Sequence, residues 1–201
     1  MDKVMQETKL DTLTIGAGDL ADLLLGASVA MDKGKDSISR LGSVYLSANG
    51  NKVIAKASDR YRLIAGESEI AGESELGECQ IRANDVKNIL ASIKANKVAG
   101  EITLTRAGDS LSVAIGGTSL TIQLGTGVFP PYKHLIPSES VAIEGIAFNP
   151  AFMADFAKVP CSNMAGAMVS MTFAGERKPI KVTIPHDSIK WEALLMPMRT
   201  A

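Results

Sequence analysis

The segment Ala57-Ser58-Asp59-Arg60-Tyr61-Arg62-Leu63 is a short charged turn between two apolar stretches, and it is the part of the chain most informative about the fold. Two later segments belong beside it: Phe129-Pro130-Pro131-Tyr132-Lys133-His134-Leu135-Ile136-Pro137 and Leu194-Leu195-Met196-Pro197-Met198-Arg199. Taken separately, the three are a surface turn, a proline-rich linker and the end of an apolar strand. Their order and spacing therefore carry more information than any one of them alone.

Outward from these segments, the chain repeats one pattern about every 65 residues, in which a strand leads into a helix and three strands follow. The first copy predicts a strand at Leu10–Ile15, a helix at Ala17–Met31, and strands at Leu41–Ala48, Lys52–Ala57 and Tyr61–Glu69. Asn49-Gly50-Asn51 predicts a hairpin turn between two of these strands, because Asn and Gly accept the positive φ of tight turns.

The other two copies follow the same order. The second predicts a strand at Glu78–Ile81, a helix at Ala83–Ala95, and strands at Glu101–Arg106, Ser110–Ile115 and Ser119–Leu124. The third predicts a strand at Val141–Phe148, a helix at Pro150–Val159, and strands at Met168–Ala174, Ile180–Ile184 and Ile189–Met196. Each helix carries one apolar stripe, so we expect an α+β fold of repeated β-α-β-β-β units with helices packed on antiparallel sheets.

The composition limits the function. The chain has 201 residues, 46% of them apolar, and a formal net charge of −1, so any contact with DNA must come from charge placed on one surface. Cys79 and Cys161 form no CxxC pair, and His134 and His186 lack ligand-like neighbours, so we expect no metal site and no catalytic centre. No apolar run approaches the roughly 20 residues of a membrane helix, which predicts a cytoplasmic protein without membrane contact.

One motif offers a different interpretation. Gly16-Ala17-Gly18-Asp19-Leu20-Ala21 follows a predicted strand and opens a predicted helix, as in the GxGxxA fingerprint of a nucleotide-binding oxidoreductase. That fingerprint needs a parallel strand after the helix, whereas antiparallel hairpins are predicted here. The simpler interpretation is a helix entry in which Asp19 favours the positive end of the helix dipole.

The three opening segments, in this order, resemble those of the bacterial replicative sliding clamp, the β subunit of DNA polymerase III. The resemblance extends from about Leu10 onward and implies the DNA-clamp fold, no enzymatic activity and no cofactor. It implies a ring that encircles duplex DNA without reading its sequence and tethers a DNA polymerase as a processivity factor. It also implies that short peptides of the polymerase and the clamp loader bind one groove. A clamp-like peptide-binding adaptor that does not encircle DNA is the alternative.

Residues that match the family's groove come from all three segments. One wall is implied to contain Leu41, Ser58, Arg60, Tyr61, Arg62 and Leu63, and the other Pro137, Leu194, Met196 and Pro197. Arg60 stands where the family usually has a small residue, so it is expected to narrow the groove or to favour an acidic peptide.

The resemblance also implies that helices line the hole of the ring. The helix surface turned toward DNA is then expected to carry Arg82, Lys87, Lys94 and Lys97, with Lys33 and Lys35 after the first helix. Lys87 and Lys94 are two turns apart and share one helix face, where they would meet phosphates; a merely solvated lysine face is the alternative.

The chain matches only part of the family's three-domain subunit. It corresponds to a complete clamp domain over residues 1–128, a linker over 129–137 and half a domain over 138–201, a compact version that suits a bacteriophage. The half-domain is expected to be completed by a neighbouring chain. Because the family's rings contain twelve units, three units a chain imply a homotetramer with alternate chains flipped, which we favour over a three-chain ring.

Overall fold

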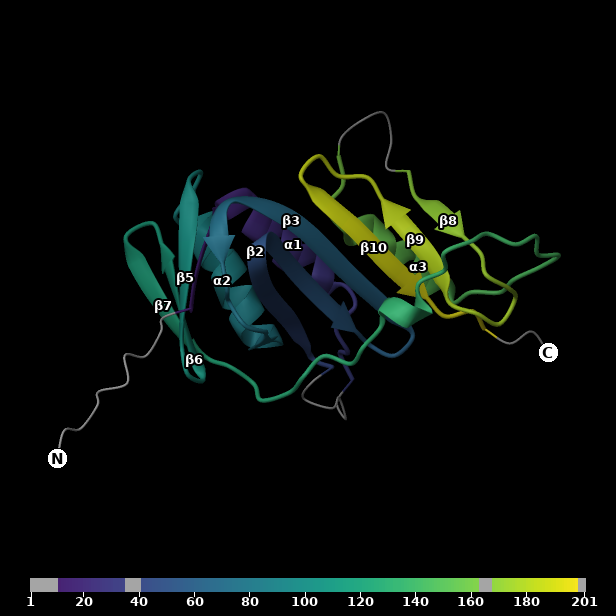
Figure 1. Ribbon diagram of the computed structural model, residues 1–201, viewed down its shortest axis with the longest axis horizontal. Coiled ribbons are helices and arrows are strands. Elements are labelled where there is room, and N and C mark those ends of the chain that lie inside the picture. Colours follow the sequence, from purple (N-terminus) through teal and green to yellow (C-terminus); the bar gives the residue numbers. More distant parts are fainter. Residues whose placement is uncertain (1–10, 35–40, 163–167, 199–201) are drawn as a thin grey trace.

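The computed structural model describes residues 11–34, 41–162 and 168–198 (Figure 1). Residues 1–10, which include the predicted start of the first strand, and Lys35 lie outside the described part. The elements in chain order are β1 (Asp11–Gly16), α1 (Ala17–Ser28), β2 (Ser43–Ser58), β3 (Arg62–Ser74), β4 (Cys79–Arg82), α2 (Ala83–Ala95), β5 (Glu101–Ala107), β6 (Ser110–Ile115), β7 (Thr118–Gln123), the 3₁₀ turn η1 (Lys133–Leu135), α3 (Pro150–Asp155), the 3₁₀ turn η2 (Phe156–Lys158), β8 (Ser170–Thr172), β9 (Ile180–Ile184) and β10 (Ile189–Leu195).

The strands form two antiparallel sheets, ordered β1-β5-β6-β7 and β4-β2-β3-β10-β9-β8. The predicted α+β class with antiparallel sheets is confirmed. The first two units exchange their leading strands, because β1 pairs with β5 and β4 pairs with β2. The third unit joins the first through β10, which pairs with β3, so one sheet continues past the predicted linker. Figure 1 shows β7 and β8 at opposite ends of an elongated molecule.

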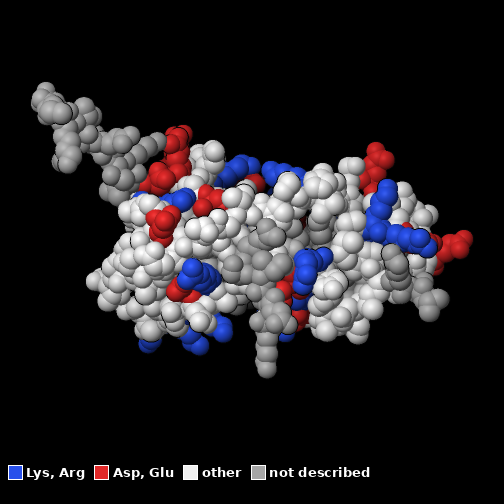
Figure 2. Space-filling view, turned by 90° about the horizontal axis from the view of Figure 1, so that it is seen from below, with Lys and Arg blue, Asp and Glu red and all other residues white. Residues whose placement is uncertain are grey.

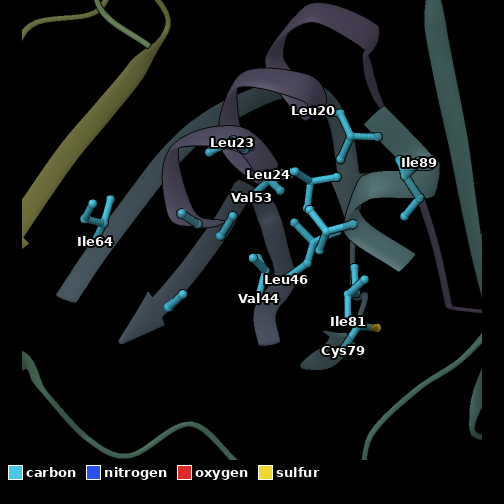
Figure 3. Packing of buried hydrophobic residues seen from close by; sticks show 14 of the residues in the cluster. Leu20, Leu23, Leu24, Val44, Leu46, Val53, Ile64, Cys79, Ile81 and Ile89 are labelled. Carbon is cyan, nitrogen blue, oxygen red and sulfur yellow. The ribbon is translucent and has the colours of Figure 1, made fainter. Parts of the chain in front are cut away.

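The main core lies between the helices and the sheets. Leu20, Leu23 and Leu24 form the apolar stripe of α1 and are completely buried. Figure 3 shows Leu20 on the side of α1 that faces Ile89 of α2, in one cluster with Val44 and Leu46 of β2. The 3.6-residue period of α1 therefore places its apolar stripe on the sheet, as the sequence predicts.

Trp191 of β10 connects the third unit to this core. Its indole ring is 1% exposed and lies against Gly26 of α1 and Gly66 of β3. A Cβ at Gly26 would lie 2.3 Å from the ring, and one at Gly66 would lie 2.4 Å from it. Only the absence of side chains at both glycines lets the helix, the strand and the indole approach this closely.

The predicted hairpin at Asn49-Gly50-Asn51 is wrong. β2 runs through these residues, and its pairing with β3 shifts register between Gly50 and Lys52. Gly50 has a φ of +58°, the conformation that also occurs in a β-bulge. A local Asn-Gly signal does not distinguish a bulge from a turn, whereas the long pairing of β2 with β3 does. Consequently two long strands, and not three, follow α1.

The prediction for the start of the third unit is also wrong. Val141–Phe148 forms no strand, and its one β-bridge joins Ala147 to Met198. The helix that follows ends at Asp155 and continues as the 3₁₀ turn η2. A strand needs a partner for its backbone hydrogen bonds, and no described strand lies beside this segment.

The strand that precedes the Gly16–Ala21 motif does not form a nucleotide-binding βαβ unit. β1 and β2 lie in different sheets, and all described strand pairs are antiparallel. The carboxylate of Asp19 instead accepts a hydrogen bond from the hydroxyl of Ser188, 2.5 Å away. Within the described ranges, no helix is long and apolar enough to cross a membrane.

The packing of Trp191 predicts opposite effects for two glycines of α1. Gly26→Ala should lower the free energy of unfolding by about 2 kcal/mol, because the new methyl group overlaps a buried ring. Gly18→Ala is the control, since nothing lies within 4 Å of its Cβ position. It should be neutral or stabilising by up to about 1 kcal/mol, the helix preference of Ala. Urea unfolding of both variants measures this, and equal effects would contradict the packing role of Trp191.

Candidate functional site: the turn at residues 58–62

The turn between β2 and β3 is organised by Asp59. Its carboxylate accepts hydrogen bonds from the backbone N–H groups of Tyr61 (3.0 Å) and Arg62 (2.7 Å). Ser58 closes the turn, because its hydroxyl donates to the carbonyl of Arg62 at 2.8 Å and accepts from the N–H of Arg60 at 3.2 Å. The short polar residues thus satisfy the turn's own backbone, as Asx turns do.

Arg62 is a buried cation with two anionic partners. Its side chain is 6% exposed and forms salt bridges with Asp59 at 2.9 Å and with Asp155 of α3 at 2.5 Å. Hydrogen bonds from Lys158 and Arg62 lower the pKa of Asp155 below its usual value. This network therefore stabilises the fold above the pKa of an ordinary aspartate, and the stabilisation is lost as the pH falls through the lowered pKa.

Phe152 of α3 packs against two residues of the turn. The Arg62 guanidinium lies 4.4 Å from the centre of this ring, and Tyr61 stacks on it with ring centres 5.7 Å apart. Tyr61 still remains 56% exposed. The third unit thus fixes the orientation of an exposed aromatic side chain that belongs to the first unit.

The C-terminal segment runs alongside the turn. The N–H of Met196 donates to the carbonyl of Tyr61 at 2.9 Å. Met196 is 37% exposed and Tyr61 is 56% exposed. The turn and the C-terminal segment, which both belong to the family resemblance, therefore lie side by side. Their exposed side chains form a small apolar surface, which we call the Tyr61–Met196 surface.

Leu63 and Leu194 lie beneath the linker and not on that surface. They are cross-strand neighbours on β3 and β10, and they are 7% and 5% exposed. Phe129 of the linker packs on them, and Tyr132 and Ile136 cover the same cluster. The linker already covers these two leucines, so they expose little surface to a binding partner.

The remaining groove candidates are spread around the turn. Leu41 is buried, and its carbonyl accepts from the N–H of Asp32, whose carboxylate is 4.0 Å from the Arg60 guanidinium. Pro197 directly follows Met196 and is partly buried. Pro137 lines a different hollow of about 490 Å³ on the linker side of the sheet, whose lining includes neither Tyr61 nor Met196.

Sequence reasoning missed Phe152, Asp155 and Phe129 as residues of this site. In the sequence, Phe152 is one apolar residue of the third predicted helix, and nothing around Asp155 marks it as a partner of Arg62. Both contacts span about 90 residues of chain, so only the folded structure brings them to the turn. Phe129 belongs to a segment that the resemblance highlights, but its burial could not be read from the segment itself.

The basic candidates gather on one helix. Lys87 and Lys94 are exposed on α2, opposite its buried residues Val86, Ile89 and Ile93. Arg82, Lys97 and Lys33 are also exposed. Figure 2 shows that, on the face it draws, Lys and Arg side chains lie in several separate groups among Asp and Glu and form no continuous basic patch.

The helix α1 is not basic. Its first turns carry Asp19 and Asp22, which contact Ser188 and His186 of the third unit. No group of three His, Cys, Asp or Glu side chains that could hold a metal ion occurs in the part of the chain that the structure describes. Of the two long helices, α2 therefore carries the exposed lysines and α1 does not.

Several solved structures resemble this arrangement. They include the DNA polymerase III β subunit of Thermotoga maritima (TM-score 0.81, 18% identity, 100% of this chain and 68% of that chain covered). The DNA polymerase sliding clamp of Bacillus subtilis gives a TM-score of 0.78 at 15% identity over 100% of this chain and 67% of the other. The β sliding clamp of C. crescentus gives 0.80 at 16% identity over 99% and 68%. The fold is that of a bacterial sliding clamp.

The similarity is one of structure. No protein-family model and no curated protein matches the sequence. At these identities the shared property is the fold, and the chain spans about two thirds of the length of each clamp. The sequence resemblance rested on three short segments, and the structure extends it to the arrangement of all units.

The backbone at Arg60 gives a testable consequence. Its φ of +77° lies in the left-handed region, which disfavours every residue with a Cβ. Arg60→Gly should therefore be more stable than Arg60→Ala by about 1 kcal/mol, because both remove the same side chain but only glycine relieves the backbone. Thermal and urea unfolding compare the two. An alanine variant as stable as the glycine variant would contradict the left-handed turn.

Proposed function

We propose that this chain is a sliding clamp, a non-enzymatic ring that encircles duplex DNA and tethers a DNA polymerase. The observation that supports this most is the structural similarity to bacterial clamps over the whole chain. The exposed lysines of α2 would meet phosphates without reading the sequence, since phosphate contacts position a protein but carry no base information. A ring can hold DNA by its closure, so a net charge of −1 is compatible with this role.

We propose that the Tyr61–Met196 surface binds short peptides of the polymerase and of a clamp loader. An exposed tyrosine beside an exposed methionine suits an apolar peptide, because methionine adapts its shape and aromatic residues often dominate the binding energy. Arg60 and Lys158 flank this surface with 64% and 65% exposed side chains, so an acidic residue in the peptide would be favoured.

Ring closure requires several chains, and we propose a homotetramer over a trimer. One sheet runs from β1 to β7 and the other from β4 to β8, and no described strand pairs with the outer edge of β7 or of β8. Their positions at opposite ends of the molecule allow one joint through each edge. Joining like edges alternately flips the chains, which gives isologous contacts and an even number of subunits.

Encirclement is tested by retention on circular DNA. The chain is mixed with a relaxed circular plasmid at a dilution that favours separate chains, concentrated so that rings close around the DNA, and passed through a sizing column. We expect co-elution that survives moderate salt and is lost after the plasmid is cut once. Blocking the cut ends with bulky protein should restore retention. Equal retention on circular and open linear DNA would contradict encirclement and favour the peptide-binding adaptor.

In the same assay, the combined change Lys87→Glu and Lys94→Glu should reduce retention and lower the slope of its logarithmic salt dependence by about 2. The control is Lys133→Glu with Lys190→Glu, an equal charge change at residues that line the hollow on the opposite sheet face. If both pairs behave alike, the α2 lysines are an ordinary solvated face.

The peptide surface is tested with Tyr61→Ala combined with Met196→Ala. This pair should weaken binding of a polymerase C-terminal peptide at least about tenfold, because both side chains are exposed anchors. DNA retention should stay unchanged. Leu25→Ala is the control, since Leu25 is an equally exposed apolar residue on α1. Fluorescence anisotropy of a labelled peptide measures the affinity, and an unchanged value would place the groove elsewhere.

A further inference from the structure

The first two units complete each other by exchanging their leading strands. β1 leads into α1 but pairs with β5 of the second unit, and β4 leads into α2 but pairs with β2 of the first. The residues two and four positions before each helix are Ile15 and Leu13, and Ile81 and Cys79, all at most 2% exposed. Each unit therefore supplies the outermost strand of the other unit's sheet.

The third unit has the same pattern but makes no such exchange. Phe148 and Ile146 lie two and four positions before α3, yet both are only partly buried. The N–H of Met198 donates to the carbonyl of Ala147 at 2.8 Å. The segment 141–148 is therefore fixed along one backbone edge, while no described strand pairs with the other.

This hydrogen bond has a counterpart in the second unit. There the N–H of Gly125 donates to the carbonyl of Gln80 in β4 at 2.9 Å. Gln80 and Ala147 each lie three positions before their helix, and Gly125 and Met198 each follow the last strand of their unit. The segment 141–148 thus occupies the place of β4, but lacks the neighbour that β2 provides.

The matching open position is the outer edge of β8. Its counterpart in the second unit is β5, where Leu104 pairs with Val113 of β6 just as Met171 of β8 pairs with Val182 of β9. In β5 the outer edge is covered by β1, and Leu104 is 1% exposed. In β8, Met171 remains partly exposed.

Apolar surface surrounds this open edge. Val169, which corresponds to the completely buried Ile102, is 39% exposed. An apolar hollow of about 180 Å³ lies beside it, lined by Val169, Met153 and Phe156 among others. An exposed strand edge with apolar surface next to it favours the addition of another strand.

We propose that two copies of this chain exchange the segment 141–148 across a twofold axis, each adding it antiparallel to β8 of the other. Following the pairing of β1 with β5, Ala147 of one copy lies opposite Ser170 of the other, as Thr14 lies opposite Thr103. The same register sets Ile146 opposite Met171 and Phe148 opposite Val169. The exchange supplies one of the two joints of the ring proposed above and rests on that proposal for its role.

A second copy fits this edge because it carries its own segment 141–148, which also lacks a neighbouring strand. The exchange would pair the open backbone edges of both copies at once. The chain's own segment does not fill the edge. The N–H of Val141 donates to the carbonyl of Phe173, directly after β8, at 2.8 Å, and among the described residues no backbone hydrogen bond joins the segment to β8 itself. The intramolecular exchange of β1 and β4 is a precedent within the same chain.

Disulfide trapping tests the register. In a Cys161→Ala background, Ala147→Cys with Ser170→Cys should form a covalent dimer on mild oxidation, doubling the mass on a non-reducing gel. Cys79 remains in place, because burial raises the pKa of its thiol to about 11 and keeps it protonated. The positive control is Thr14→Cys with Thr103→Cys, whose hydroxyl oxygens are 3.4 Å apart and which should cross-link within one chain.

Two outcomes would overturn the exchange. One is a disulfide within a single chain for Ala147→Cys with Ser170→Cys; the other is no disulfide there while the positive control cross-links. The register control, Ala147→Cys with Thr172→Cys, is shifted by two residues and should cross-link far less. Equal cross-linking of both pairs would also contradict the register.

The experiment distinguishes a failure of the strand exchange from a failure of the proposed clamp function. Retention of the oxidised protein on circular plasmid reports on the ring, whereas the gel reports on the exchange. A covalent dimer without retention supports the exchange and contradicts the clamp. Retention without a covalent dimer supports the clamp and overturns the exchange.

Discussion

The contact of Trp191 with Gly26 and Gly66 holds the third unit on the first, and the candidate site depends on it. The indole comes from β10, one glycine from α1 and the other from β3, so a single buried ring fixes three elements. Burial of a large aromatic side chain contributes several kcal/mol, comparable to a sizeable part of a domain's net stability. With β10 fixed, Met196 reaches Tyr61, and α3 brings Phe152 and Asp155 to Arg62.

A second constraint is that every strand needs a backbone partner. Within the first two units this is met by exchange, which buries the apolar residues of both leading strands. Applied to the third unit, the same constraint leaves one segment without a neighbour and one strand edge uncovered. The proposed assembly follows from this, since a ring whose joints restore missing strands requires no large polar or charged interface of its own.

Hydrophobic patterns in the sequence predicted the bounds of helices and strands best where they agreed with the long-range packing and strand pairing of the folded chain. The bounds of α2, β6 and β9 match the prediction, because amphipathic or alternating patterns there coincide with burial in the folded chain. The hairpin at Asn49–Asn51 failed because a glycine with positive φ serves a bulge equally well. Segment 141–148 is apolar enough for a strand, but its composition cannot show whether a partner strand lies beside it.

The site was predictable in part. The resemblance named the turn and the C-terminal segment, and the structure brings Tyr61 and Met196 together. It could not show that Leu63 and Leu194 lie beneath the linker, because Phe129 covers them through a contact across the sheet. Nor could it name Phe152, whose stacking under Tyr61 depends on the docking of a distant helix.

The absolute mass in solution tests the central claim most directly. Light scattering behind a sizing column, over a dilution series, should give a mass near four chains that falls through two chains on dilution. A plateau at three chains would contradict the alternating joints through β7 and β8. A monomer at every concentration would contradict the ring and leave the open edges of both sheets without a partner.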